Sequence, residues 1–93
     1  MKTALSSPTV RAFLRAGLVV LIRYLGPISH PAARIAHRIA VAISLADRAI
    51  EAQGWVSEEL ISLEKELRKS SRKNPELVPL YKSVRGLRMA VKG

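Results

Sequence analysis

Residues 8–27 read PTVRAFLRAGLVVLIRYLGP, and this stretch has the pattern of a complete helix with both ends marked. Ser7 followed by Pro8 is typical of a helix start, because a serine side chain caps free backbone N–H groups and proline suits the first turn. Gly26 and Pro27 are typical of a helix stop. We therefore predict a helix over residues 8–25.

The apolar side of this helix is wider than a surface helix needs. Its members are Val10, Phe13, Leu14, Leu18, Val20, Leu21, Tyr24 and Leu25. Three arginines share the other side with alanines and Val19. We expect such a helix at the centre of the fold, in an oligomer interface or on a membrane surface. The candidate protein-interface residues on it are Phe13, Leu14, Leu18 and Leu21.

A second helix is predicted over residues 31–53, with Pro31 in its first turn and Gly54 just beyond its end. Its apolar stripe is Ile35, Ile39, Ile43, Ala46 and Ile50. Trp55 follows the predicted turn. It is either a lid over the junction of two helices or an anchor in a protein interface, where tryptophan is enriched. We add Trp55 to the candidate interface residues.

Two further helices are predicted, over about residues 58–70 and 76–91. Ser57 is the expected cap of the third helix, and Pro79 and Gly86 weaken the fourth. No strand is predicted. The sequence therefore predicts one all-α domain over residues 1–93, with three to four helices and an apolar core formed by the first two. Residues 68–93 form a basic segment that is either folded or partly extended.

The net charge is +9, and it is unevenly distributed along the chain. Residues 1–46 carry six Lys or Arg and no acid, residues 47–67 carry six acids against two bases, and residues 68–93 carry eight bases and one acid. A strongly positive field attracts nucleic acid, anionic lipid or an acidic protein surface. This order predicts two anion-facing zones, or a single patch if the two ends fold together.

The C-terminal cations are the candidate polyanion-binding residues: Arg68, Lys69, Arg72, Lys73, Lys82, Arg85, Arg88 and Lys92. Four of them belong to the run RKSSRK, which also matches a solvated helix end. The chain has four aromatic residues and one asparagine, so it offers few side chains that could stack on or read bases. Binding to nucleic acid would therefore be directed at phosphates and weakened by salt.

No residue pattern indicates catalysis, and we predict no catalytic residues, no metal site and no cofactor. The two histidines, His30 and His37, are seven residues apart and no cysteine accompanies them, which does not suit zinc. We predict that His30 caps a helix and that His37 is a surface residue. Asp47 and Glu51 are one helical turn apart beside Arg48, which is typical of a solvated helix face.

The N-terminal region does not read as a membrane span, because the uncharged run from residue 16 to residue 22 is far shorter than the roughly 20 residues needed. It is also a poor secretory signal. The acid-free first 25 residues match the loose composition of an organelle transit peptide, and the alternative is an ordinary first helix. We expect an intracellular or particle-associated protein.

Taken together, these features favour a non-enzymatic, structural or accessory subunit of a nucleic-acid-containing assembly such as a virion or ribonucleoprotein. The expected partners are the phosphate backbone of nucleic acid and either another protein or a second copy of the chain. One alternative is a peripheral membrane protein whose first helix lies on anionic lipid. Another is a regulator that binds a protein.

Overall fold

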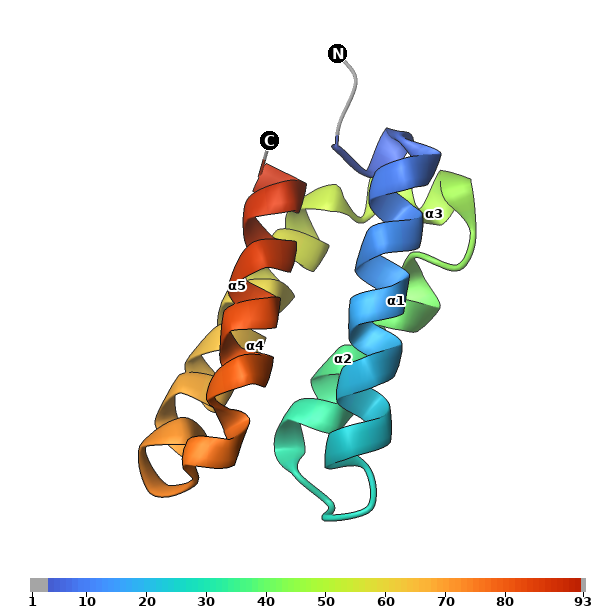
Figure 1. Cartoon of the computed structure of the whole chain (residues 1–93). Coiled ribbons are helices and arrows are strands. Elements are labelled where there is room, and N and C mark those ends of the chain that lie inside the picture. The colour runs from blue at the N-terminus through green and yellow to red at the C-terminus, as the bar shows by residue number, and fades with distance from the viewer. Residues whose placement is uncertain (1–3, 93) are drawn as a thin grey trace.

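The computed structural model describes residues 4–92, with the side chain of Lys92 outside the described part, and all its regular elements are helical (Figure 1). The predicted all-α class is confirmed. In chain order the elements are a 3-10 helix η1 (Ala4–Ser6), α1 (Pro8–Leu25), α2 (Pro31–Ala42), α3 (Ala46–Glu51), α4 (Gln53–Lys73), a 3-10 helix η2 (Pro75–Leu77) and α5 (Val78–Lys92).

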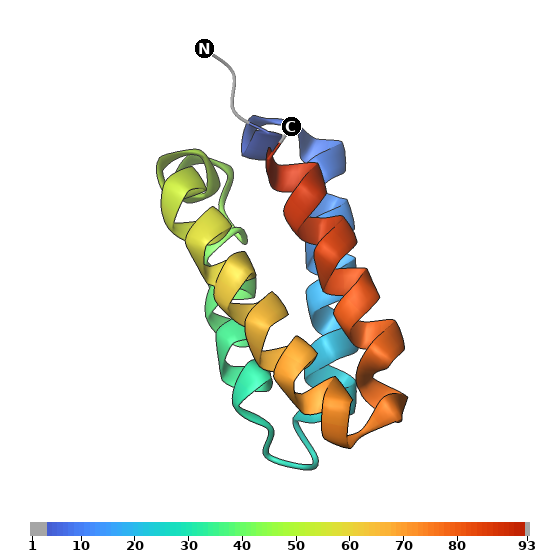
Figure 2. The ribbon, with the colours of Figure 1, turned by 90° about the vertical axis from the view of Figure 1, so that its left-hand side faces the viewer.

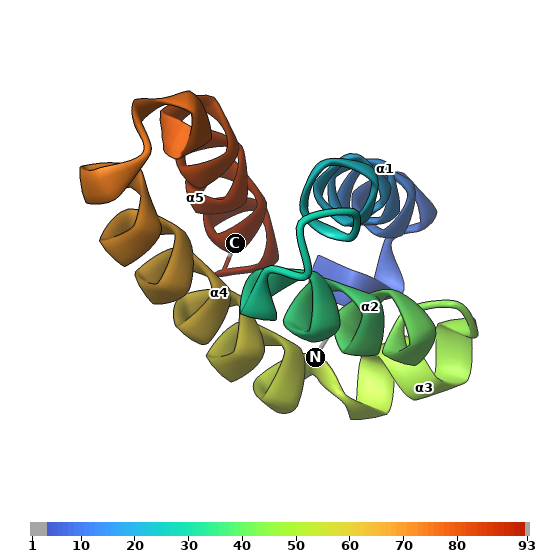
Figure 3. The same cartoon turned by 90° about the horizontal axis from the view of Figure 1, so that it is seen from below.

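Two helical hairpins, α1–α2 and α4–α5, lie side by side, and the short helix α3 joins them (Figures 1 and 3). Neighbouring long helices alternate in direction. In Figure 1, α1 and α5 form the front layer, with α2 and α4 behind them. The resulting bundle measures 41 × 22 × 19 Å.

Helix α1 has the predicted boundaries, so the prediction over residues 8–25 is confirmed. The Ser7 Oγ accepts a hydrogen bond from the Val10 N–H at 3.4 Å, and the Gly26 N–H donates to the Ile22 carbonyl at 2.9 Å. His30 begins α2 as its cap, because its Nδ1 accepts from the Ala32 N–H at 3.0 Å. Its Nε2 lies 2.7 Å from the Ser70 Oγ on α4.

The predicted helix over residues 31–53 is wrong, because the chain breaks after Ala42 and restarts as α3 at Ala46. Neither glycine nor proline marks this break. The Ser44 Oγ donates to the Val41 carbonyl at 2.7 Å, a local bond that competes with the helical ladder. Because the chain changes direction at this break, Ala49 is buried and Ile50 is exposed.

The predicted boundaries of the third helix are also wrong. Gly54 was expected just beyond a helix end and Ser57 as a cap, but both lie within α4, which begins at Gln53. Glycine inside a helix costs about 1 kcal/mol relative to alanine. Burial of the α4 side chains Val56 and Leu60 offsets that cost.

Helix α5 is continuous from Val78 to Lys92 despite Pro79 and Gly86. Pro79 lies in the first turn, where its missing N–H breaks no helical hydrogen bond. A Cβ added to Gly86 would meet no atom within 4 Å, so this glycine faces open space. The fourth predicted helix is therefore divided into η2 and a regular α5.

The core is larger than predicted, because α4 and α5 contribute to it as fully as α1 and α2. Its buried residues from the long helices are Leu14, Leu18, Leu21, Leu25, Ala32, Ala36, Ile39, Val56, Leu60, Leu63, Leu67, Leu80, Val84, Leu87 and Val91. The expectation that the first two helices alone form the core is wrong. The small alanines of α2 allow α1 to approach it closely.

Gln53 ties three segments together at the end of the bundle where η1 and the end of α5 meet (Figure 2). The Gln53 Oε1 accepts a hydrogen bond from the Leu5 N–H at 3.1 Å, and its Nε2 donates to the Val91 carbonyl at 3.0 Å. Arg11 donates to the Leu5 carbonyl at 2.8 Å. These bonds satisfy backbone groups that the short 3-10 helix and the helix end leave unpaired.

Candidate polyanion-binding face

Four cations lie along one side of α4, at positions 65, 68, 69 and 72. This spacing of three, four and seven residues places Lys65, Arg68, Lys69 and Arg72 on the same face of a helix. Together they line a shallow hollow of about 300 Å³. We call these four residues, together with the exposed Arg85 of α5 and Lys82, which lies three residues before it on the same side of that helix, the basic face.

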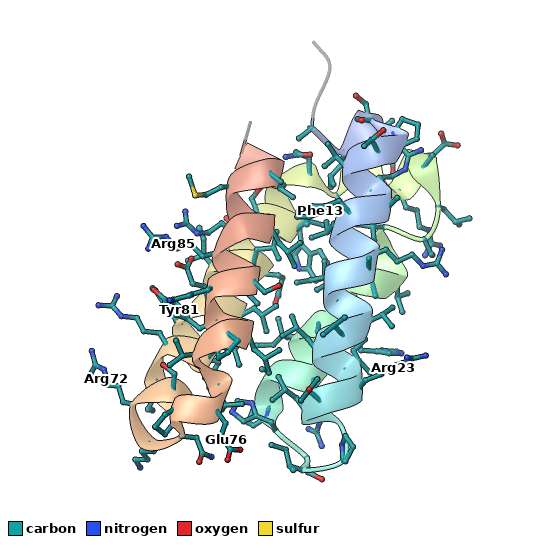
Figure 4. The ribbon with its side chains drawn as sticks, in the orientation of Figure 1. Phe13, Arg23, Arg72, Glu76, Tyr81 and Arg85 are labelled. Carbon is teal, nitrogen blue, oxygen red and sulfur yellow. The ribbon has the colours of Figure 1, made fainter. Side chains whose placement is uncertain are left out.

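The α4–α5 hairpin joins the two halves of the basic face. A second hollow, of about 270 Å³, shares Lys65 and Arg68 with the first and extends to Arg88 on α5. Arg72 and Arg85 project from the same side of the molecule, away from α1 and α2 (Figure 4). Cations that are 13 residues or more apart in the sequence thus share one surface.

Two acids of the central acidic block are held in ion pairs within the fold. Glu64 of α4 pairs with Arg88 of α5, and Glu59 of α4 pairs with Arg38 of α2 at 3.4 Å. No residue of the basic face makes an ion pair with another described residue. Its positive charge is therefore not neutralised by the fold.

Arg88 differs from the other predicted polyanion-binding residues because of its pairing with Glu64. Its side chain is 28% exposed and that of Glu64 is 15% exposed, so the pair is partly shielded from water. Lys73 is exposed in the last turn of α4, where a cation also stabilises the negative end of the helix dipole. The side chain of Lys92 lies outside the described residues.

Lys65 is the member of the basic face that sequence analysis missed. Lys65 lies within the acid-rich segment of residues 47–67, and because that segment has a net negative charge, Lys65 was not counted among the predicted polyanion-binding residues. The signal that could have found it is its spacing from Arg68, Lys69 and Arg72, which matches one face of a helix.

The five candidate interface residues divide into two groups. Leu14, Leu18 and Leu21 are at most 1% exposed and already pack within the core of this chain, so they offer no surface to a partner. Phe13 and Trp55 are 54% and 39% exposed. Only these two are kept as candidate interface residues.

The apolar side of α1 is thus half buried and half exposed. Val20 and Tyr24 are exposed with Phe13, at intervals of seven and four residues that place them along one stripe. Figure 4 shows Phe13 on the side of α1 that borders α5. Gly17 lies in the same stripe, and a Cβ there would lie 2.8 Å from the Leu87 Cδ1, which indicates that the two helices approach closely at this point.

Of the residues weighed for chemistry, His37 and Glu51 line one hollow at α2, α3 and the start of α4, while His30 and Asp47 lie outside it. His30 is engaged as a cap, while His37, Asp47 and Glu51 are exposed. The described residues include no group of three or more histidine, aspartate or glutamate side chains placed to hold a metal ion.

No helix within residues 4–92 has both the length and the apolar character needed to cross a membrane. Comparison with known protein families, curated proteins and solved structures finds nothing that matches this chain.

Proposed function

We propose that this chain is a non-enzymatic, basic accessory subunit of a nucleic-acid-containing assembly and that it contacts phosphates through the basic face. The observation that supports the proposal best is the row of four unpaired cations along α4. None of these four cations makes an ion pair with another described residue, and Glu64, which lines the neighbouring hollow with Lys65 and Arg68, is engaged with Arg88.

The length of the row suits a phosphate backbone. From Lys65 to Arg72 the helix axis advances by about 10 Å, at about 1.5 Å per residue. One strand of B-form DNA advances about 3.4 Å along the duplex axis per phosphate. Because the strand winds around the axis, neighbouring phosphates are farther apart than this rise, and the row spans about two of them. Lys82 and Arg85 on α5 widen the same surface, so that it would also contact the second strand of a duplex or further phosphates of the first strand.

Recognition on this face would be insensitive to base sequence. Phe13 and Tyr24 belong to α1 and Trp55 lines a hollow elsewhere, while Tyr81 of α5 is half-buried. No aromatic side chain lines either hollow of the basic face, so a base-stacking platform is missing there. Electrostatic attraction to phosphates would then supply the binding affinity, which should fall steeply as the salt concentration rises.

The direct test is fluorescence anisotropy of the protein with a labelled random-sequence duplex over a salt series. Four to six phosphate contacts predict a plot of log K against log salt with a slope of about −3.6 to −5.4, since each contact contributes about −0.9. Absence of binding at low salt would reject a nucleic-acid role for the basic face.

The exposed stripe of α1 supports a second candidate, a peripheral contact with anionic lipid. Phe13, Val20 and Tyr24 present apolar surface, and Arg15 and Arg23 are exposed on the same helix. This candidate predicts co-sedimentation with anionic liposomes that is lost in Val20→Glu. Leu18→Glu is unsuitable for this test, because Leu18 is fully buried and the variant would be strongly destabilised, so lost sedimentation would not report on lipid contact. Unchanged sedimentation of Val20→Glu would reject this candidate.

An accessory subunit also needs a protein contact, either with another protein or with a second copy of this chain. The exposed side chains of Phe13 and Trp55 are the proposed contacts. Sedimentation equilibrium tests the second copy directly: self-association that Phe13→Ser weakens is expected, and a monomer at all concentrations would exclude a homo-oligomer.

A further inference from the structure

A hollow of about 580 Å³ lies where α2, α3 and the first turn of α4 meet, and none of its lining residues belongs to the basic face farther along α4. Figure 3 shows these three helices as neighbours. The hollow exists because the chain breaks after Ala42 and α3 turns away from the line of α2. The hollow is shallow and open to solvent, and its volume falls within the range of about 300–1,000 Å³ that is typical of small-molecule sites.

Most of the lining is apolar. Val41 and Ala42 come from the end of α2, Ala52 from the turn between α3 and α4, and Trp55 from the first turn of α4. Val41 is 51% exposed, and the indole of Trp55 is also partly exposed. Two large apolar side chains therefore border a hollow that no other described segment fills.

Two guanidinium groups border the same hollow from different helices. The side chain of Arg48 on α3 makes no hydrogen bond or ion pair with any described residue. Arg38 of α2 has one long contact, with Glu59, and its side chain is 59% exposed, so most of its donors are unused. Guanidinium groups bind carboxylates well, because their N–H donors match the two carboxylate oxygens.

Glu51 is the one acid in the lining, and it limits the charge that the hollow accepts. The other polar lining residues are Arg38, Arg48 and His37, and with two arginines against one glutamate a ligand with one negative charge is attracted. A second negative charge would be repelled by Glu51. A phosphate backbone, with many charges and little apolar surface, fits this lining poorly.

We propose that this hollow is a binding site for a small organic monocarboxylate with an aromatic or branched apolar body. The apolar body would lie against Val41, Ala52 and Trp55, and the carboxylate would accept hydrogen bonds from Arg38 and Arg48. This role is separate from polyanion binding, because the two sites share no residue.

Trp55 is the only tryptophan of the chain, so its emission reports directly on this site. The probe is 4-phenylbutyrate, which does not absorb at the excitation wavelength of tryptophan, and its matched neutral control is 4-phenylbutyramide. We expect the acid to shift the emission in a saturable way and to bind at least tenfold more tightly than the amide. Equal binding of both compounds, or of neither, would overturn the proposal.

Arg48→Gln should weaken 4-phenylbutyrate binding about tenfold and leave the amide unaffected. Arg34→Gln is the matched control, because Arg34 is an exposed arginine of α2 outside the lining. An equal loss in both variants would assign the effect to net charge and overturn the proposal.

Ala52→Leu should abolish binding of the acid by filling the hollow, and circular dichroism checks that helix content is kept. Undiminished binding in the folded variant would overturn the proposed location.

A last comparison identifies the source of the carboxylate. The dipeptide acetyl-Phe-Glu-amide carries the same phenyl and carboxylate groups as part of a peptide. The proposal predicts that it binds more weakly than 4-phenylbutyrate. Tighter binding of the dipeptide would overturn the assignment to a free acid and would indicate a segment of a partner protein.

Discussion

The two helical hairpins are built alike but present their positive charge differently. In the α4–α5 hairpin, unpaired cations lie on one outer surface, and Glu64 is engaged with Arg88. In the α1–α2 hairpin, arginines lie among exposed apolar side chains, and two of them, Arg11 and Arg38, are held by partners within the fold. A candidate polyanion surface is therefore distinguished by the placement of its cations on one face rather than by their number.

The largest effect is expected from a charge placed on the buried side of α1. Leu18→Glu buries an unpaired carboxylate at a fully buried position and should cost about 3–5 kcal/mol, a large part of the stability of a small domain. Val20→Glu, on the exposed stripe of the same helix, should change the free energy of unfolding by less than about 1 kcal/mol. Urea denaturation followed by circular dichroism measures both. Equal losses would contradict the division of α1 into a buried and an exposed half.

A smaller effect is expected from the residue that links the two hairpins at one end. Gln53→Ala removes the hydrogen bonds to Leu5 and Val91 and should cost about 1–2 kcal/mol, because the partner groups are only partly open to water. Ser62→Ala is a suitable control, since Ser62 is exposed on α4. Thermal unfolding of the two variants distinguishes them. A melting temperature for Gln53→Ala equal to that of the control would show that the link is not stabilising.

The smallest effect is expected at the ion pair that separates Arg88 from the basic face. Glu64→Gln releases Arg88 and should reduce stability by only about 1 kcal/mol, since the pair is partly exposed. The same variant adds one positive charge beside Lys65 and Arg68, so it should strengthen binding to a duplex severalfold at low salt. Weaker binding would mean that Glu64 orders the basic face and does not oppose it.

Helix α1 could be predicted to the residue because both ends carry strong local signals, Ser7-Pro8 and Gly26-Pro27. The break after Ala42 could not, because it depends on a serine hydroxyl and on the burial of Ala49, and neither produces a distinct sequence pattern. Gly54 misled the prediction because glycine is a common helix stop, whereas here packing of α4 overrides that preference.

The two runs of cations that contribute to the basic face could be predicted from the sequence, but the individual cations that belong to it could not. The runs around Arg72 and Arg85 were visible as charge, and the hairpin that unites them follows from two helices joined by a short turn. The pairing of Arg88 with Glu64 and the hollow beside Trp55 both depend on contacts between helices. Composition and spacing carry no information about such contacts.

Two triple variants of equal charge show whether the arrangement of the cations matters more for duplex binding than the net charge. One replaces Arg68, Lys69 and Arg72 with glutamine, and the other replaces the exposed Arg15, Arg23 and Arg34. Duplex binding is measured over a salt series. The first variant should lower the magnitude of the salt slope by about 2.7, at about 0.9 for each lost phosphate contact, while the second keeps the slope of the unmodified protein. Equal changes in the two variants would contradict the account, because they would attribute binding to the net charge of the whole chain.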